Sequence, residues 1–155
     1  MSDSHTKSRI RNLATTHLPI LLYCIVGLGF LFQGVRYISA TELMPYHLAV
    51  IETPWEGLDA SYQTLFLGLL KGFGTGSFCV GLAIILLALI PLRRGSRWAR
   101  WVIPVIALTY TSALIYVTSF ALLPGATPIL VTTTLLGFVI AAVISSFFSA
   151  DSDAG

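Results

Sequence analysis

The stretch LFLGLLKGFGTGSFCVGLAIILLALI, residues 65–90, contains a single charged residue, Lys71. A membrane-spanning helix needs about 20 predominantly apolar residues, so this stretch is long enough to cross a bilayer. The whole chain has the same character, because 55% of its 155 residues are hydrophobic and 10% are charged. In an ordinary soluble domain roughly 25% of residues are charged. The sequence therefore predicts an integral membrane protein.

The apolar residues fall into four blocks, and each block is long enough for one span. They cover residues 18–38, 63–91, 99–122 and 128–149. The blocks are continuous rather than alternating with period 2, which favours helices over a β-barrel. We therefore expect an all-α fold, a single membrane domain over residues 1–155 built as an integral membrane four-helix bundle. Residues 39–62 would form a partly helical extracytoplasmic cap, and residues 92–98 a cytoplasmic loop.

The distribution of charge predicts the orientation of the bundle. Basic residues cluster before the first span and between the second and third, at Lys7, Arg9, Arg11, Arg93, Arg94, Arg97 and Arg100. The connection between the first two spans carries four acids instead, Glu42, Glu52, Glu56 and Asp59. By the positive-inside rule, both termini of this multi-pass protein face the cytoplasm.

Stripes of small residues predict where the helices touch, because close backbone approach and polar contacts drive helix association in lipid. Gly68, Gly72 and Gly76 recur every four residues in the second span. This stripe suits packing within one chain or between chains, and the sequence leaves both open. Small or hydroxyl residues also follow helical spacing in the other spans, at Gly27 and Gly34, at Thr109, Ser112, Tyr116 and Ser119, and at Thr134, Gly137, Ala141 and Ser145. We expect each stripe to mark an interior face.

The connection ISATELMPYHLAVIETPWEGLDASY is long and apolar enough to fold onto the outer face of the bundle. Thr53-Pro54-Trp55-Glu56 has the form of a helix start, with threonine as the N-cap, proline at the first helical position and glutamate completing a capping box. Upstream, apolar residues and His47 are spaced for one face of a short helix, at Leu43, Met44, His47, Leu48 and Ile51. Trp55 would anchor this cap.

Lys71 is the residue that most needs an explanation. If the second span begins near Tyr62, a rise of about 1.5 Å per residue places Lys71 about 13 Å inside a hydrocarbon core of about 30 Å. A charge at that depth costs about 3 kcal/mol or more, so it should face inward and find a partner. We expect Glu56 or Glu42 to pair with Lys71, as a structural ion pair or within a ligand site. A tilted helix or a late start of the span is the alternative.

These residues together predict a polar pocket beneath an acidic lid. Arg36 and Lys71 are the basic residues outside the cytoplasmic set, and His47 is the only histidine of the outer loop. The predicted ligand-binding residues are Arg36, His47, Trp55, Glu56 and Lys71, with His47 as the titrating member. Tyr110 and Tyr116 of the third span could line the same cavity.

Motifs for common chemistry are missing from the sequence. It contains no HExxH, GxSxG, P-loop or CxxC, and its histidines, His5, His17 and His47, are scattered. We therefore expect no catalytic constellation, no metal site, no cofactor and no nucleic-acid partner. Cys24 and Cys79 sit in separate spans, where small polarizable packing residues are common.

Three segments carry a resemblance to known proteins: MPYHLAVIETPWEGLD, QTLFLGLLKGFGTGSFCVGLAI and IPLRRGSRWARW. Over roughly residues 20–125 the chain resembles a group of small bacterial inner-membrane proteins, most specifically at Pro45-Tyr46-His47, Trp55, Leu58, Lys71 and Arg97-Trp98-Ala99-Arg100. Its general plan is similar to that of the four-helix DoxX-like membrane proteins. The resemblance implies a four-span bundle in a bacterial cytoplasmic membrane. It assigns no activity and transfers no catalytic residues.

Three functions are compatible with the sequence. The first is a membrane module that binds a small amphiphile, a lipid or an anionic group in the outer mouth of the bundle. The second is a structural or accessory subunit whose glycine stripe packs against a second copy or another membrane subunit. The third is an intramembrane enzyme that uses His47 or Lys71 as acid or base.

Overall fold

The computed structural model describes the backbone of residues 2–120 and 127–151, and the side chains of residues 17–119 and 130–147. The described residues form five α-helices, α1 (Ser2–Ile38), α2 (Pro45–Ile51), α3 (Ala60–Leu87), α4 (Ala99–Phe120) and α5 (Thr127–Asp151). A 3₁₀ helix, η1 (Trp55–Gly57), precedes α3, and a π-helix, η2 (Ala88–Leu92), follows it. No strand occurs within these ranges.

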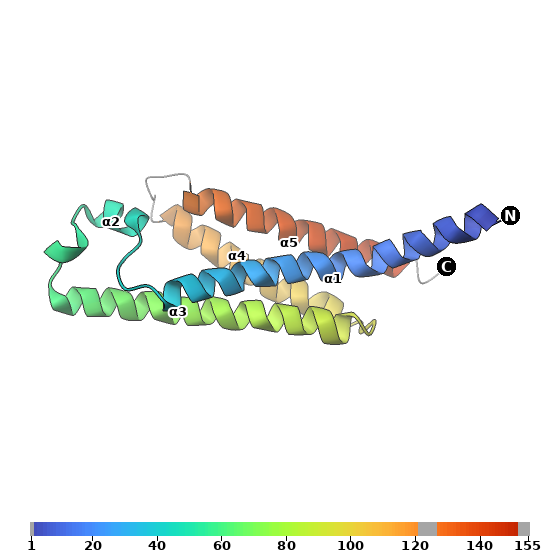
Figure 1. Cartoon of the computed structure of the whole chain (residues 1–155), viewed down its shortest axis with the longest axis horizontal. Coiled ribbons are helices and arrows are strands. Elements are labelled where there is room, and N and C mark those ends of the chain that lie inside the picture. Colours follow the sequence, from blue (N-terminus) through green and yellow to red (C-terminus); the bar gives the residue numbers. More distant parts are fainter. Residues whose placement is uncertain (1, 121–126, 152–155) are drawn as a thin grey trace.

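Four of the helices, α1, α3, α4 and α5, run side by side along the length of the molecule (Figure 1). α1 packs most extensively against α3 and next against α5, and α4 packs mainly against α5. The predicted all-α four-helix membrane bundle is confirmed. We call the end of the bundle that carries α2 the cap end, and the end that carries residues 93–98 the arginine end.

The four helices contain apolar stretches long enough to cross a membrane, at His17–Ile38, Ala60–Leu92, Ala99–Ser119 and Leu130–Phe147. The chain is therefore a multi-pass membrane protein. The second stretch is the longest, with 33 residues, and it starts at Ala60 rather than at the predicted residue 63. The predicted short connection between the last two spans falls largely on residues 121–126, which lie outside the described residues.

Two pairs of glycines hold α1 against α3. A Cβ atom added to Gly34 would lie 2.8 Å from the carbonyl oxygen of Gly74, and one added to Gly81 would lie 2.6 Å from that of Gly27. Real Cβ contacts are longer, so the two backbones can approach this closely only where side chains are missing. The predicted packing face of Gly27 and Gly34 is confirmed. The partners that sequence reasoning missed are Gly74 and Gly81, seven residues apart like Gly27 and Gly34.

The interior of the bundle is a column of apolar side chains from all four helices. Its fully buried members include Tyr23, Phe30, Ile84, Ile103 and Val139. Hydroxyl groups interrupt this column at Ser77 and Thr111, which are also fully buried. The phenol of Tyr110 shares a short hydrogen bond with Ser77, which links α4 to α3.

Three of the predicted interior stripes face outward instead. A Cβ atom on Gly68, Gly72 or Gly76 would meet nothing within 4 Å. In α4 the exposed members are Thr109, Ser112, Tyr116 and Ser119, and in α5 they are Thr134, Gly137 and Ala141, with Ser145 half-buried. Only the stripe of α1 marks a contact between helices of the same chain.

Local hydrogen bonds explain why the hydroxyl stripes can face away from the interior of the bundle. Thr134 Oγ1 donates to the carbonyl oxygen of Leu130 at 2.7 Å, and Ser119 Oγ donates to that of Tyr116 at 2.9 Å. A hydroxyl that is satisfied by its own helix can face lipid without an unpaired polar group. Helical spacing of hydroxyl residues therefore identifies a face but does not say which way it points.

The turn at the arginine end follows from two residues. Pro91 has no N–H to donate to the preceding turn, and the backbone widens there into the π-helix η2, in which Arg93 N donates to the carbonyl oxygen of Ala88 at 3.2 Å. Gly95 then adopts a left-handed conformation with φ of 74°. Gly95 N donates to Leu92 and Ser96 N to Pro91, the bonding pattern of a Schellman motif that ends the helix.

The glycine contact predicts a difference between two substitutions. Gly34→Ala should lower the stability of the purified protein by roughly 1–3 kcal/mol, because its methyl group must displace backbone atoms of α3. Gly72→Ala is the matched control in the neighbouring helix, because its methyl group enters open space. Thermal unfolding in detergent measures both. Equal melting temperatures for the two variants would contradict the close contact.

Candidate functional site

The cap is fixed to the bundle by a small second apolar cluster. Its buried members are Ala40, Leu43 and Leu70. Partly buried side chains pack around them, from Tyr37, Met44, Leu48, Ile51, Trp55 and Phe66. The predicted short helix is confirmed as α2, but Leu43 and Met44 of the predicted face lie before it, and its packed residues are Leu48 and Ile51. The cap therefore joins the end of α1 to the first turns of α3.

The predicted capping box is wrong. η1 begins at Trp55 with Pro54 rather than Thr53 as its N-cap, and no side-chain hydrogen bond caps it. The hydroxyl of Thr53 donates backward to the carbonyl oxygen of Ile51 at 3.1 Å. Leu58 then returns to an extended conformation, so the segment makes only one 3₁₀ turn. Gln63 holds that turn against α3, because its amide donates to the carbonyl oxygens of Trp55 and Leu58 at 2.9 and 3.1 Å.

A polar aromatic group lies where α2 meets α1. The hydroxyl groups of Tyr37 and Tyr46 share a hydrogen bond of 2.6 Å. The imidazole of His47 lies 4.3 Å from the ring of Tyr46 and 6.3 Å from that of Tyr37, measured between ring centroids. Its Nδ1 atom is buried and has no hydrogen-bond partner among the described residues. Within the cap, His47 is thus surrounded by aromatic rings rather than by carboxylates.

Burial and nearby charge act on the two titratable groups of α2. Burial raises the pKa of Tyr46, the hydrogen bond with Tyr37 raises it further, and the charge of Arg36 lowers it in part. The phenol therefore stays protonated at neutral pH. Burial lowers the pKa of His47, because the charged imidazolium loses solvation there. The neutral imidazole is the form that this cap favours.

The aromatic contacts continue from the cap into the bundle. The ring of Tyr37 lies 5.6 Å from that of Phe73, and Phe73 stacks on Tyr110 at 6.5 Å. Tyr110 in turn meets the edge of Phe30 at 5.0 Å. Tyr110 therefore belongs to the interior next to the cap, whereas Tyr116, the other tyrosine expected to line a cavity, is exposed.

The contact between α1 and α3 changes the expected depth of Lys71. A Cβ atom on Gly74 would meet Tyr37 and Ile38, so Gly74 lies level with the last residues of α1. Lys71 comes three residues earlier and lies beyond that level. Counting from Leu92 at the other end of the span, a rise of about 1.5 Å per residue puts Lys71 roughly 32 Å away, about the thickness of the hydrocarbon core. This geometry favours the late start of the span, with Lys71 at the membrane edge.

The predicted ion pair of Lys71 does not form. Lys71 is exposed, and it has no ion pair with a described carboxylate. Arg36 is also exposed and likewise has no carboxylate partner among the described residues. Glu42 and Glu56, the expected partners, are exposed on the cap. Lys71 therefore reaches the surface of the chain without a carboxylate beside it.

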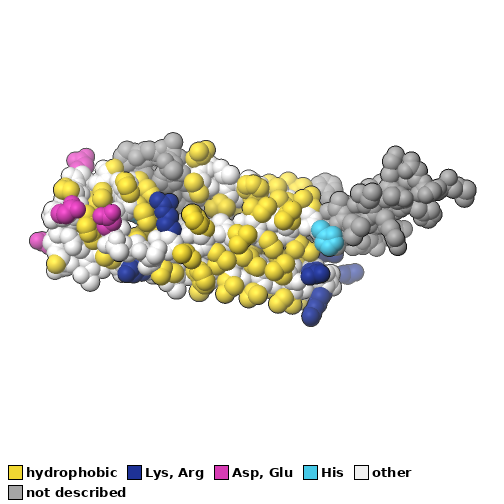
Figure 2. Space-filling view, in the orientation of Figure 1, with side chains coloured by type: hydrophobic (Ala, Val, Ile, Leu, Met, Phe, Trp, Pro, Cys, Tyr) yellow, Lys and Arg dark blue, Asp and Glu magenta, His cyan; other side chains and the backbone are white. Residues whose placement is uncertain are grey.

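The five predicted site residues thus separate into three groups. His47 and Trp55 pack within the cap, where Trp55 belongs to the second apolar cluster. Arg36 and Lys71 lie about 6 Å apart along the bundle axis, if one counts residues from the level of Gly74. Glu56 is exposed in the first turn of η1. Figure 2 shows basic side chains between the acidic side chains of the cap and the hydrophobic surface of the bundle.

Sequence reasoning missed Tyr37 and Tyr46 as members of this site. Tyr37 lies near the end of the first span, where tyrosine is common at the membrane interface. That position gave no reason to expect its hydrogen bond with Tyr46. The available signal was the pair Tyr46-His47 in a helix directly after the first span, since two polar aromatic side chains near a span end need partners when they are buried.

The arrangement limits the chemistry of the cap. General acid–base catalysis needs a second group within hydrogen-bond reach of the acid or base. The described residues supply no such partner to His47 Nδ1 and no carboxylate to Lys71. Where side chains are described, no three histidine, cysteine or carboxylate groups come together as metal ligands. What the cap end does present is two exposed cations, Arg36 on α1 and Lys71 on α3, beside the apolar surface of the bundle and the exposed acids of the cap.

Comparison of this chain with protein-family models, with curated proteins and with solved structures finds no match. The function must therefore be argued from the geometry.

The environment of His47 predicts that the cap loosens in acid. Because the pKa of His47 is lowered while the cap is docked, the undocked state binds more protons between that lowered pKa and about 6.5, the ordinary value. The contribution of His47 to docking is complete above pH 6.5 and is lost as the pH falls through this window. Hydrogen exchange of the α2 amides, corrected for intrinsic pH dependence, should accelerate below pH 6.5.

His47→Gln should remove this acid-induced acceleration. His17→Gln is the matched control, because His17 lies at the arginine end, and it should preserve the acceleration. If the exchange of α2 responds to acid equally in both variants, His47 is not the responsible group.

Proposed function

We propose that this chain is a small bacterial inner-membrane protein that binds the anionic headgroup of an amphiphile or lipid at its cap end. Both termini face the cytoplasm, because the arginine end carries the basic connection. The cap then faces the outer leaflet. Arg36 and Lys71 hold the anionic group, and the packed cap fixes the surface around them.

The observation that carries this proposal is the exposure of two unneutralised cations at the cap end of the spans. Arg36 and Lys71 are exposed and have no described carboxylate partner. Phosphate oxygens form strong charge-assisted hydrogen bonds with both side-chain types. Each basic residue near an anionic membrane surface contributes about 1 kcal/mol.

The surroundings of the two cations suit an amphiphile rather than a free anion. Phe32 of α1 is 72% exposed and Phe78 of α3 is 37% exposed. Phe32 is one turn from Arg36 and Phe78 is two turns from Lys71, so each lies on the same helix face as its cation and nearer the middle of the bundle. An acyl chain can therefore cover apolar side chains while its headgroup contacts the cations. His47 and Trp55 act indirectly, by holding the cap in place, and Glu56 would repel an anion.

Removing the two cations tests this proposal. Arg36→Gln with Lys71→Gln should weaken the binding of added phosphatidylglycerol at the cap end about 25-fold, or about fivefold for each cation. Native mass spectrometry of the purified full chain, titrated with this lipid, measures the change. Glu56→Gln is the control in the cap, and it should not weaken binding because it removes a repelling charge.

Unchanged binding by a folded Arg36→Gln, Lys71→Gln variant would refute the cap-end site. So would an equal loss in Arg97→Gln, which removes an exposed cation from the arginine end.

The open glycine stripe supports a second candidate function, a subunit of a membrane assembly. A Cβ atom on Gly68, Gly72 or Gly76 would meet no described residue within 4 Å, whereas other glycines form the contact between α1 and α3. Small residues at a spacing of four allow two membrane helices to pack closely. A second copy of α3, or a helix of another subunit, would find room there.

Gly72→Leu should then dissociate the assembly while the fold survives, because its side chain enters open space in the single chain. Gly137→Leu on α5 is the matched control, since a Cβ atom there also meets nothing within 4 Å. Crosslinking in membranes followed by gel analysis reports the oligomeric state. An assembly that tolerates Gly72→Leu, or a chain that is monomeric to begin with, would rule this function out.

A further inference from the structure

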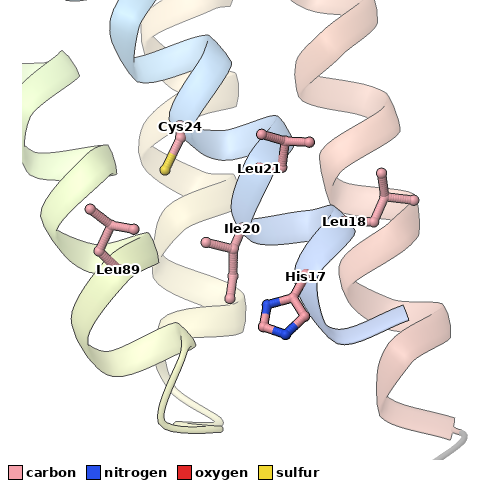
Figure 3. A pocket seen from close by; sticks show the side chains of 6 residues that line it. All are labelled: His17, Leu18, Ile20, Leu21, Cys24 and Leu89. Carbon is pink, nitrogen blue, oxygen red and sulfur yellow. The ribbon is translucent and has the colours of Figure 1, made fainter. Parts of the chain in front are cut away.

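A groove at the arginine end lies outside everything proposed so far. It has a volume of about 570 Å³ and is lined by His17, Leu18, Ile20, Leu21, Cys24 and Leu89. Figure 3 shows Ile20 and Cys24 on the side of α1 that is nearer to Leu89 of η2, with the ring of His17 at the lower edge. The groove thus runs along the first turns of the apolar span of α1, beside the π-helix.

The walls of the groove are apolar and open to the surroundings. Leu18, Leu21 and Leu89 are 48%, 58% and 44% exposed. Because α1 and η2 belong to membrane-spanning segments here, the groove opens to the hydrocarbon layer rather than to water. His17 is the strongly polar residue among its described lining residues, and His17 is also the first residue of the apolar stretch of α1. The groove therefore has an apolar body and a polar rim at the level of the headgroups.

Exposed arginine side chains lie next to this rim. The π-helix bonds of η2 place Arg93 and Arg94 about one turn beyond Leu89. Both arginines are exposed, as is Arg97 in the following turn. All carboxylates with described side chains lie in the cap, between Glu42 and Asp59, at the other end of the bundle. Figure 2 shows basic side chains close to a histidine at the end opposite the acidic cap.

We propose that the groove binds an acyl chain of an anionic phospholipid, whose phosphate contacts Arg93 and Arg94. The charge selects the ligand, because an apolar groove alone would accept any acyl chain, whereas arginines without nearby acids favour a net negative headgroup. Basic pockets between membrane helices recognise anionic headgroups in this way. His17 offers an imidazole hydrogen bond at the rim. This site lies at the opposite end of the bundle from Arg36 and Lys71 and does not depend on the cap-end proposal.

Photo-crosslinking tests this site directly. The full chain is placed in nanodiscs that contain trace phosphatidylglycerol with a diazirine in its acyl chain, or phosphatidylcholine with the same chain. Peptide mass spectrometry then gives the crosslink yield on residues 17–24 and 89. Residues 137–144 of α5 serve as the reference, because Gly137, Ile140 and Ile144 are exposed there and are not among the residues that line this groove. The ratio of the two lipids should be severalfold above one at the groove and near one at the reference.

Three double variants test whether Arg93 and Arg94 select the anionic lipid over the neutral one. Arg93→Gln with Arg94→Gln should bring the ratio at the groove close to one, because the charges that favour the anionic headgroup are removed. Arg93→Lys with Arg94→Lys keeps the charge that sets topology and should keep most of the ratio. Arg36→Gln with Lys71→Gln should leave it unchanged, so that failure of the cap-end site and failure of this site are told apart.

The proposal is overturned if both lipids crosslink equally at the groove, because the groove then accepts any lipid. It is also overturned if the neutral double variant keeps the wild-type ratio, or if the α5 reference shows the same preference as the groove.

Discussion

The close contact of α1 with α3 is the constraint on which the other features depend. Gly27 meets Gly81 and Gly34 meets Gly74, so the two backbones touch where neither helix has a side chain. Two contacts along one pair of helices fix both the rotation and the register of α3 against α1. That register places Gly74 beside the end of α1 and lets the first turns of α3 project beyond it. The projecting turns are what the cap packs against.

The same register separates the charges of the chain. Lys71 lies just beyond the level of the end of α1 and is exposed there rather than buried between helices. The acids of the cap are exposed, and the arginines that follow η2 lie at the opposite end. A cation at the headgroup level costs little, whereas one near the middle of the bilayer costs about 3 kcal/mol or more. The arginine end therefore presents positive charge beside apolar surface, whereas the cap end presents two cations beside four exposed acids.

Much of the fold could be predicted because a long apolar segment can adopt few backbone structures in a bilayer. The four spans and α2 were expected from length and spacing, and the structure confirms them. The faces of α3, α4 and α5 could not be predicted in the same way. Thr134 and Ser119 bond to their own helices, and the glycine stripe of α3 meets nothing, so small or polar residues there do not mark the interior.

The sequence alone determined that this chain spans the membrane, how many times it does so and where its charges lie along the chain, because these follow from composition and from the fixed rise of a helix. Only the tertiary structure decided which glycines touch, at what level Lys71 lies and which groups surround His47. Those properties depend on the register between helices, which two short backbone contacts set and which no single helix contains. The candidate site at the cap end and the groove at the arginine end both result from that register.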